Sequence, residues 1–293
     1  EDVDRAIERA QAALASWREV SVRERARMLR GAADRMRVRR DEIAGIIIRE
    51  NGKNWRNADA DVCEAIDFCN YYAAEAPRLF EPRRLGRFAG ELNIEFHEPR
   101  GLAAVISPWN FPLAIACGMT TAALVCGNPT ILKPAEQTPG IARVLVDLLH
   151  ESGIPRDVLQ LLCGQGETVG AALVRDPRVA LIAFTGSKAV GLDILAAAGQ
   201  TRDGQAFVKH VVCEMGGKNA IIVDASADLD EAVIGVRDSA FGFSGQKCSA
   251  CSRAIVVESR HDEFVKRLVE STEPLLVGDP LDPATDLGPV IDD

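Results

Sequence analysis

The chain has 293 residues, and its 34 basic and 43 acidic side chains give a formal net charge of −9 at pH 7. That balance argues against nucleic acid or an anionic membrane as the main partner, because both require a concentrated positive surface. Hydrophobic residues make up 47% and charged residues 26% of the chain, the ordinary mixture of a soluble globular protein with a large core. Disordered, collagen-like and disulfide-scaffold classes are therefore excluded.

The first eighty residues show helical spacing of apolar side chains. We expect helices over 3–17, 22–36, 41–50 and 58–76, with Ser21 as the N-cap of the second and Pro77 as the end of the fourth. The segment 91–98 alternates polar and apolar residues, which predicts a half-exposed strand.

From residue 101 onward, short apolar strands alternate with helical stretches. The expected strands are 102–106, 130–132, 158–162, 180–184, 208–213 and 220–223. The expected helices are 113–125, 141–151, 168–175, 188–198 and 229–241. This alternation predicts a doubly wound α/β fold, a Rossmann-type parallel sheet covered on both faces.

The stretch from Gly101 to Leu132 carries no charge and is long enough to cross a bilayer. Pro108, Pro112 and Pro129 divide it into pieces too short to span, because each proline interrupts a continuous helix. We therefore interpret it as strand, turn, helix, turn and strand, with no membrane span.

Ligands of open parallel sheets bind at the carboxyl ends of the strands, so the turns there are the first places to look for chemistry. The turn after Ile106 contains Asn110, whose amide is a donor suited to a developing oxyanion. An alternative is a buried turn in which Asn110 bonds its own backbone. The turn after the next strand carries Lys133 and Glu136, which suit a phosphate or the hydroxyls of a ribose, or form only a surface ion pair.

Two further strand ends suggest nucleotide binding. Gly164, Gly166 and Gly170 resemble a dinucleotide fingerprint with one residue too many before the last glycine, which is a weak signal. Where Phe184 is followed by Thr185-Gly186-Ser187, a strand meets a helix N-terminus, and free N–H groups there suit a pyrophosphate.

Two residues downstream are candidates for bond making. Glu214 follows a strand of apolar residues. Apolar surroundings raise the pKa of a carboxylate, as a general base requires. Cys248 lies beside Lys247 in a loop of small residues, surroundings that favour a thiolate nucleophile. Cys248 and Cys251 also form a C-x-x-C pair, so a redox dithiol or half of a zinc site must be weighed, although a metal is not expected because two further ligands are lacking.

The residues of these motifs and their order along the chain resemble those of a known family. The chain resembles the aldehyde dehydrogenase superfamily in five successive segments: 108–112 (PWNFP), 133–136 (KPAE), 184–187 (FTGS), 214–217 (EMGG) and 245–248 (GQKC). The amino-acid sequences of segments 245–253 and 218–223 resemble more specifically those of the Δ1-pyrroline-5-carboxylate (glutamate-semialdehyde) dehydrogenase branch. Met215 stands where the superfamily usually has leucine, a tolerable apolar exchange.

The resemblance implies an NAD-dependent oxidation of L-glutamate γ-semialdehyde to L-glutamate in proline catabolism. Cys248 would attack the aldehyde to give a thiohemiacetal, Asn110 and the Cys248 N–H would hold the oxyanion, and Glu214 would activate water to hydrolyse the thioester. The residues implied in NAD binding are Ile106, Ser107, Pro108, Trp109, Lys133, Ala135, Glu136, Gly164, Gly166, Gly170, Phe184, Thr185, Gly186, Ser187, Val190 and Met215. Those implied in substrate binding are Phe111, Lys247 and Ser249.

The resemblance also implies an NAD-binding domain with its N-terminal helices over 1–213 and the first part of a catalytic domain over 214–293. We expect a fragment cut at both ends and inactive alone, a homo-oligomer when full length, and either fusion to or pairing with a proline dehydrogenase. Its scattered cysteines suggest a cytoplasmic location, or a mitochondrial matrix in a eukaryote. Alternative functions are a dehydrogenase for another small aldehyde, such as succinate semialdehyde, or an inactive nucleotide-binding homologue.

Overall fold

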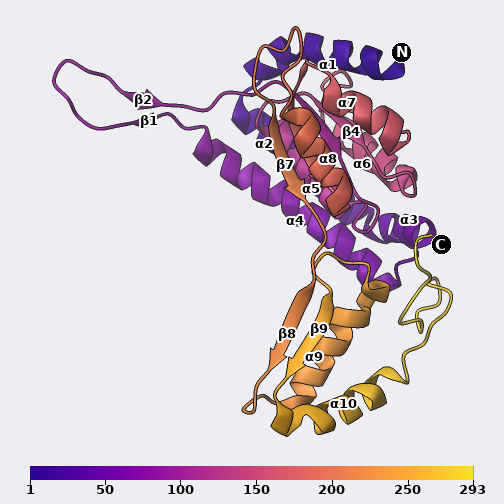
Figure 1. Ribbon diagram of the computed structural model, residues 1–293. Coiled ribbons are helices and arrows are strands. Elements are labelled where there is room, and N and C mark those ends of the chain that lie inside the picture. Colours follow the sequence, from indigo (N-terminus) through magenta and orange to yellow (C-terminus); the bar gives the residue numbers. More distant parts are fainter. Residues whose placement is uncertain (293) are drawn as a thin grey trace.

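A computed structural model describes residues 1–292 and has a five-stranded parallel sheet at its centre (Figure 1). The strand order is β5-β4-β3-β6-β7. The strands of this sheet are β3 (Leu102–Ile106), β4 (Thr130–Lys133), β5 (Leu159–Leu161), β6 (Val179–Thr185) and β7 (His210–Glu214). The predicted α/β class with a parallel sheet is confirmed.

The sheet is sandwiched between two apolar cores. Every residue of β3 and β4 is buried. Val105 faces a core shared with α2 to α6, while Ala104 and Ile106 face a second core shared with α1, α7 and α8. The alternation follows from the two-residue period of a strand, which sends neighbouring side chains to opposite faces.

The helices of the first two hundred residues form these covering layers. Their bounds are α1 (Asp2–Glu19), α2 (Val22–Val38), α3 (Arg40–Asn51), α4 (Trp55–Leu79), α5 (Ala114–Val125), α6 (Pro139–Glu151), α7 (Ala171–Arg175) and α8 (Lys188–Ala198). The predicted cap of α2 is confirmed, because Ser21 accepts a hydrogen bond from the backbone N–H of Glu24. The uncharged run 101–132 is β3, α5 and β4, as predicted. In the part of the chain described, no helix has the length and apolarity needed to cross a bilayer.

The predicted bounds of α4 were wrong at both ends. Asn54 caps the helix three residues earlier than expected, accepting a hydrogen bond from the Asn57 N–H. Pro77 lies inside the helix, which continues to Leu79. Proline removes the hydrogen bond to the carbonyl four residues back. Here that carbonyl, on Ala73, accepts a hydrogen bond from the Arg30 guanidinium at 3.3 Å, so its acceptor is not left unpaired.

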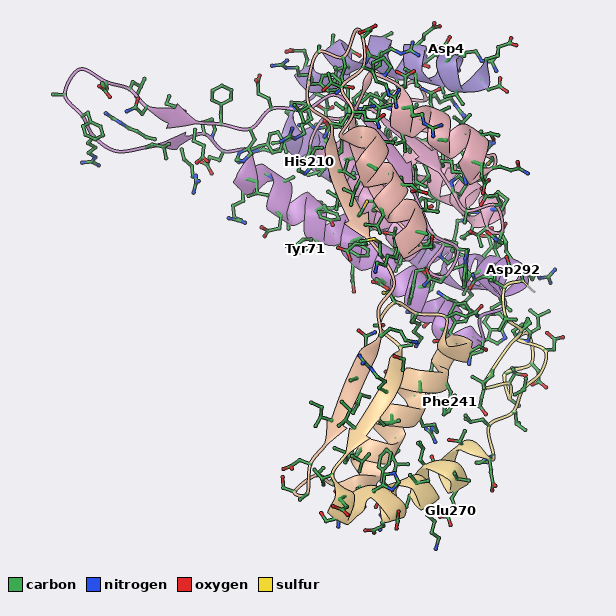
Figure 2. All side chains as sticks on the ribbon, viewed as in Figure 1. Asp4, Tyr71, His210, Phe241, Glu270 and Asp292 are labelled. Atoms are coloured by element: carbon green, nitrogen blue, oxygen red, sulfur yellow. The ribbon has the colours of Figure 1, made fainter. Side chains whose placement is uncertain are left out.

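The strand predicted over 91–98 is much shorter in the structure. Only β2 (Ile94–Glu95) forms, paired antiparallel with β1 (Arg83–Arg84) in a hairpin that projects from the body (Figure 1). Apolar side chains on this hairpin have no core to enter, and Phe88, Leu92 and Phe96 are each more than 60% exposed. Figure 2 shows that the side chains of this arm project away from the body of the molecule.

The expected strand 220–223 does not join the central sheet. It forms β8 (Asn219–Val223), parallel to β9 (Cys251–Val256), in a second sheet packed on α9 (Leu229–Phe241) and α10 (Glu258–Thr272) (Figure 1). The predicted cover on both faces fails here, because the paired Ile222 and Ile255 are 73% and 53% exposed. It also fails at β7, the edge strand, whose residues alternate between exposed and half-buried.

Arg25 joins the N-terminal helices to the central layer. Its guanidinium is buried and donates hydrogen bonds to the carbonyls of Val125, Trp17 and Val20. Burial lowers the pKa of Arg25 from its usual value, yet three carbonyl dipoles compensate the charge.

We expect Arg25→Met to lower the free energy of unfolding by about 2–4 kcal/mol, because three buried carbonyls lose a charged donor. Urea unfolding followed by circular dichroism measures the loss. Arg27→Met is the matched control, since Arg27 lies on the same helix with an exposed side chain. Equal stability of the two variants would contradict this role.

Candidate active site

The strand order reverses beside β3, and in open parallel sheets a ligand crevice is expected at such a point, outside the carboxyl ends of the strands. The chain proceeds from β3 outward through β4 to β5, and then returns to the other side of β3 with β6 and β7. Ligands of such sheets bind where the order reverses, at the carboxyl ends of the two central strands. The register brings the predicted segments together there, because Ile106 pairs with both Lys133 and Phe184, and Thr185 pairs with Glu214.

Lys133 and Glu136 form an asymmetric ion pair at this edge. The ammonium of Lys133 is buried and donates to Glu136 Oε1 at 2.6 Å, whereas the Glu136 side chain is 46% exposed. Burial acts to raise the pKa of Glu136, but hydrogen bonds from Lys133 and from the Glu136 and Gly166 N–H groups outweigh it and lower that pKa. The pair is therefore not an ordinary surface contact: it offers a fixed carboxylate to solvent. Ala135 is buried between its two members.

The glycine turn lies against the same carboxylate. Gly164 has a positive φ of 150°, and a Cβ there would stand 2.4 Å from Val169 Cγ2, so only glycine fits. Gly166 and Gly170 bound a single π-helical turn that leads into α7. A Cβ on Gly166 would lie 3.8 Å from Glu136 Oε1. A hydrogen side chain at this point therefore leaves open space beside the Glu136 carboxylate.

The start of α8 closes the other side of the crevice. Ser187 caps the helix by accepting a hydrogen bond from the Val190 N–H at 3.3 Å, and the Gly186 N–H donates to the Glu214 carbonyl at 3.1 Å. The side chain of Val190 is 48% exposed. Met215 packs closely on α8, since a Cβ at Gly191 would stand 2.7 Å from its sulfur. The flexible thioether therefore fits where the superfamily usually has leucine.

Asn110 is joined to the loop that carries the candidate nucleophile. Its Nδ2 donates to the carbonyl of Gln246 at 3.0 Å, two residues before Cys248. The alternative of an amide bonded to its own backbone was therefore wrong. Ser107 and Pro108 are buried, while Trp109, Asn110 and Phe111 are half-buried at the mouth of the turn.

The backbone of the Cys248 loop is tightly wound. Phe243, Ser244 and Gly245 have φ values of 53°, 54° and 72°, three successive left-handed residues of which only the last is glycine. Such conformations are costly for side-chain-bearing residues and occur mainly at functional sites. The loop delivers Cys248 and Ser249 exposed, with Lys247 half-buried beside a cavity of about 320 Å³.

Asn219, at the start of β8, holds the loop from the other side. Its Nδ2 donates to the carbonyls of Cys248 at 2.7 Å and Ala250 at 3.2 Å. Nothing in the sequence predicted this role of Asn219, or the contacts of Asn51, Lys53 and Asp61 near the site. A polar residue at a strand start carries no local signal of a contact 29 residues away.

Two expectations about reactive groups changed. The apolar surroundings predicted for Glu214 were wrong in this structure, because β7 is an edge strand and Glu214 is exposed at its end. The C-x-x-C pair is uneven: Cys248 is exposed, while Cys251 is buried with its thiol directed to the Arg253 carbonyl. Among residues 1–292, no three His, Cys, Asp or Glu side chains gather as metal ligands.

Comparison with known proteins places the chain in a family. The model of the aldehyde dehydrogenase family matches residues 1–293. A 1-pyrroline-5-carboxylate dehydrogenase of Geobacillus thermodenitrificans is 48% identical over 289 residues, covering 99% of this chain and 56% of that protein. A Bacillus subtilis enzyme of the same name is 43% identical, with 98% and 56% covered.

Solved structures of similar proteins point to the same family. Proline utilization A from Bdellovibrio bacteriovorus is 47% identical with a TM-score of 0.98, covering 100% of this chain and 30% of that one. The 1-pyrroline-5-carboxylate dehydrogenase from Thermus with bound NAD is 43% identical with a TM-score of 0.97, covering 99% and 56%. The chain thus spans about half the length of the curated relatives it matches. With a family model matched along its whole length, four of the five motifs at the strand ends of the central sheet and the fifth bonded to Asn110, the chain belongs to the aldehyde dehydrogenase family.

Proposed function

We propose that this chain carries the nucleophile and the cofactor site of an NAD-dependent dehydrogenase that oxidises L-glutamate γ-semialdehyde, the open form of Δ1-pyrroline-5-carboxylate, to L-glutamate. The observation that carries the proposal is the hydrogen bond from Asn110 to the carbonyl of Gln246, which sets an amide donor beside the Cys248 loop. The names of the curated relatives support the substrate and favour it over succinate semialdehyde.

The first step is attack by the Cys248 thiolate on the aldehyde carbon, which forms a C–S bond and leaves an oxyanion. The Asn110 amide has two N–H groups, and only one is used by Gln246. The second N–H, together with the backbone N–H of Cys248, is available to stabilise the oxyanion of the thiohemiacetal.

The crevice fits NAD. Glu136 offers a fixed, half-exposed carboxylate to the hydroxyls of a ribose, and Gly166 leaves space beside it. The N-terminus of α8 at Ser187 supplies a positive dipole end for the pyrophosphate. Bound there, NAD would supply the acceptor for the hydride of the thiohemiacetal carbon. Glu214 then takes a proton from a water molecule, which attacks the thioester on Cys248 and releases the carboxylic acid.

The substrate-binding residues surround the thiol. Ser249 follows Cys248 directly, Lys247 precedes it, and Phe111 follows Asn110. We assign Ser249 and Lys247 to the α-carboxylate of the substrate, since a hydroxyl and an ammonium both donate to carboxylate oxygens. Phe111 forms part of the wall of the aldehyde channel.

We further propose that residues 1–213 are the NAD-binding domain with its N-terminal helices and that 214–293 belong to the catalytic domain. The separate β8–β9 sheet supports this division. The proline utilization A relatives suggest a link to proline dehydrogenase, fused or paired. Homo-oligomer formation stays part of the proposal.

The substrate is tested by NADH formation in the full-length protein with pyrroline-5-carboxylate, succinate semialdehyde or propanal. We expect kcat/KM to be at least tenfold higher for pyrroline-5-carboxylate, because only this substrate presents an α-amino acid carboxylate to Ser249. Comparable turnover of all three would keep the thiol chemistry and remove the substrate assignment. Failure to turn over any of them would instead support the inactive homologue.

The nucleophile is tested by comparing two cysteines three residues apart. Cys248→Ala should abolish NADH formation, because no other exposed thiol lies in the loop. Cys251→Ser should keep most activity, since its buried sulfur faces a carbonyl rather than the crevice. The reverse pattern would favour a dithiol mechanism.

The ribose role of Glu136 predicts a cofactor effect. Glu136→Gln should raise the KM for NAD about tenfold or more with little change in kcat, because a charged hydrogen bond worth about 1.5–3 kcal/mol is lost. The preference for NAD over NADP should also fall, since the carboxylate no longer repels a 2′-phosphate. Glu167→Gln, an exposed glutamate in the same glycine turn, is the control. An unchanged KM for NAD in Glu136→Gln would place the ribose elsewhere.

A further inference from the structure

A buried ion pair lies behind the candidate active site. Lys53 Nζ donates to Asp61 Oδ2 at 2.8 Å, and the two side chains are 1% and 0% exposed. Among the ion pairs of residues 1–292, it is the one in which both partners are buried. Burial lowers the pKa of Lys53, and the neighbouring Asp61 opposes that shift. Removing two charges from water is costly, and the cost is offset only when good geometry and further polar contacts stabilise both charges.

The Lys53 ammonium lies over two aromatic rings from segments far apart in the sequence. Its Nζ is 4.2 Å from the centroid of Phe111 and 5.0 Å from that of Phe243. Phe111 follows the oxyanion donor Asn110, and Phe243 begins the left-handed loop that leads to Cys248. One cation therefore attracts the ring faces of both segments.

Asp61 extends the same contact to the helix that follows the Asn110 turn. Its Oδ1 accepts a hydrogen bond from the Ala114 N–H at 2.7 Å, in the first turn of α5. Asn51, two residues before Lys53, donates to the Trp109 carbonyl at 2.6 Å. The end of α3, the turn after it and the first part of α4 thus contact residues on both sides of Asn110.

We propose that Lys53 is a positioning residue that sets the Asn110 amide against the Cys248 loop, with Asp61 holding Lys53 in place. The inference rests on the proposed roles of Asn110 and Cys248. An apolar side chain of similar volume would fill the space, but it would not attract two ring faces or bond a carboxylate. Reacting groups displaced by about 1 Å can lose a hundredfold in rate.

The test uses Lys53→Met in the full-length protein and two readouts. The first is acylation by p-nitrophenyl acetate, in which the thiolate attacks the ester carbonyl, the acetyl group stays on sulfur and p-nitrophenolate leaves. This reaction requires Cys248 and an oxyanion donor but neither aldehyde nor NAD. The second is the steady-state oxidation of pyrroline-5-carboxylate. We expect acylation and kcat to fall about tenfold to a hundredfold, with the KM for NAD unchanged within about twofold.

Two further variants separate positioning from stability. Lys209→Met deletes another buried ammonium, one that donates to the carbonyls of Val174 and Asp176 away from the crevice. The Lys209→Met variant should be less stable than the wild type, but its acylation rate and kcat should stay within about twofold of the wild-type values. The double variant Lys53→Met, Asp61→Asn leaves no unpaired buried charge and keeps an oxygen acceptor for Ala114, so it should fold even where the single variant does not.

The outcomes are distinct. Slow acylation in the folded double variant supports positioning by Lys53. Wild-type acylation and kcat in either folded Lys53 variant would overturn it, and so would an equal loss of both in Lys209→Met. Wild-type protein that is acylated at Cys248 but does not oxidise pyrroline-5-carboxylate would remove the proposed substrate and leave the Lys53 inference standing.

Discussion

One hydrogen bond joins the segment of the candidate oxyanion donor to the loop of the candidate nucleophile. The bond from Asn110 to the Gln246 carbonyl joins segments 136 residues apart, one from the edge of the central sheet and one from the second lobe. A single amide–carbonyl hydrogen bond between half-buried groups contributes only about 1 kcal/mol to stability, so it cannot by itself fix the two lobes relative to each other. It depends on rigid surroundings: the proline-bounded turn on one side, and on the other the left-handed loop tied by Asn219. The proposed catalytic geometry therefore depends on these supports.

The two buried lysines of the site show how one residue type serves two purposes. Lys133 bonds a carboxylate that is 46% exposed, so its charge fixes a group that still faces solvent and that we propose binds the ribose. Lys53 bonds a carboxylate with no exposure, so its charge is used inside the protein, on Asp61 and two aromatic rings. The exposure of the partner therefore separates a binding lysine from a positioning one, although both are buried and both lie near the same strand ends.

The features that could be predicted from sequence are those with local causes. Apolar runs defined the buried strands, and the rule that ligands bind at strand ends selected Asn110, Lys133 and Ser187 as residues to examine. The Ser21 cap followed from a four-residue pattern. Other features depend on distant partners: the Ala73 carbonyl, which loses its helical donor at Pro77, accepts a hydrogen bond from Arg30, 43 residues before Ala73 in the sequence. Lys53 could not be identified for the same reason, since its rings come from residues 111 and 243.

The link between the two sheets carries the candidate base close to the loop of the candidate nucleophile. β7 ends at Glu214 and β8 begins at Asn219, so the residues between them pass from one lobe to the other. Gly217 allows that passage to run close to the loop, because a Cβ there would lie 3.1 Å from the Cys248 carbonyl oxygen. Asn219 then bonds the same carbonyl. The candidate general base and the support of the candidate nucleophile are thus carried on one short segment, and a bulkier side chain at Gly217 would displace both groups together rather than either alone.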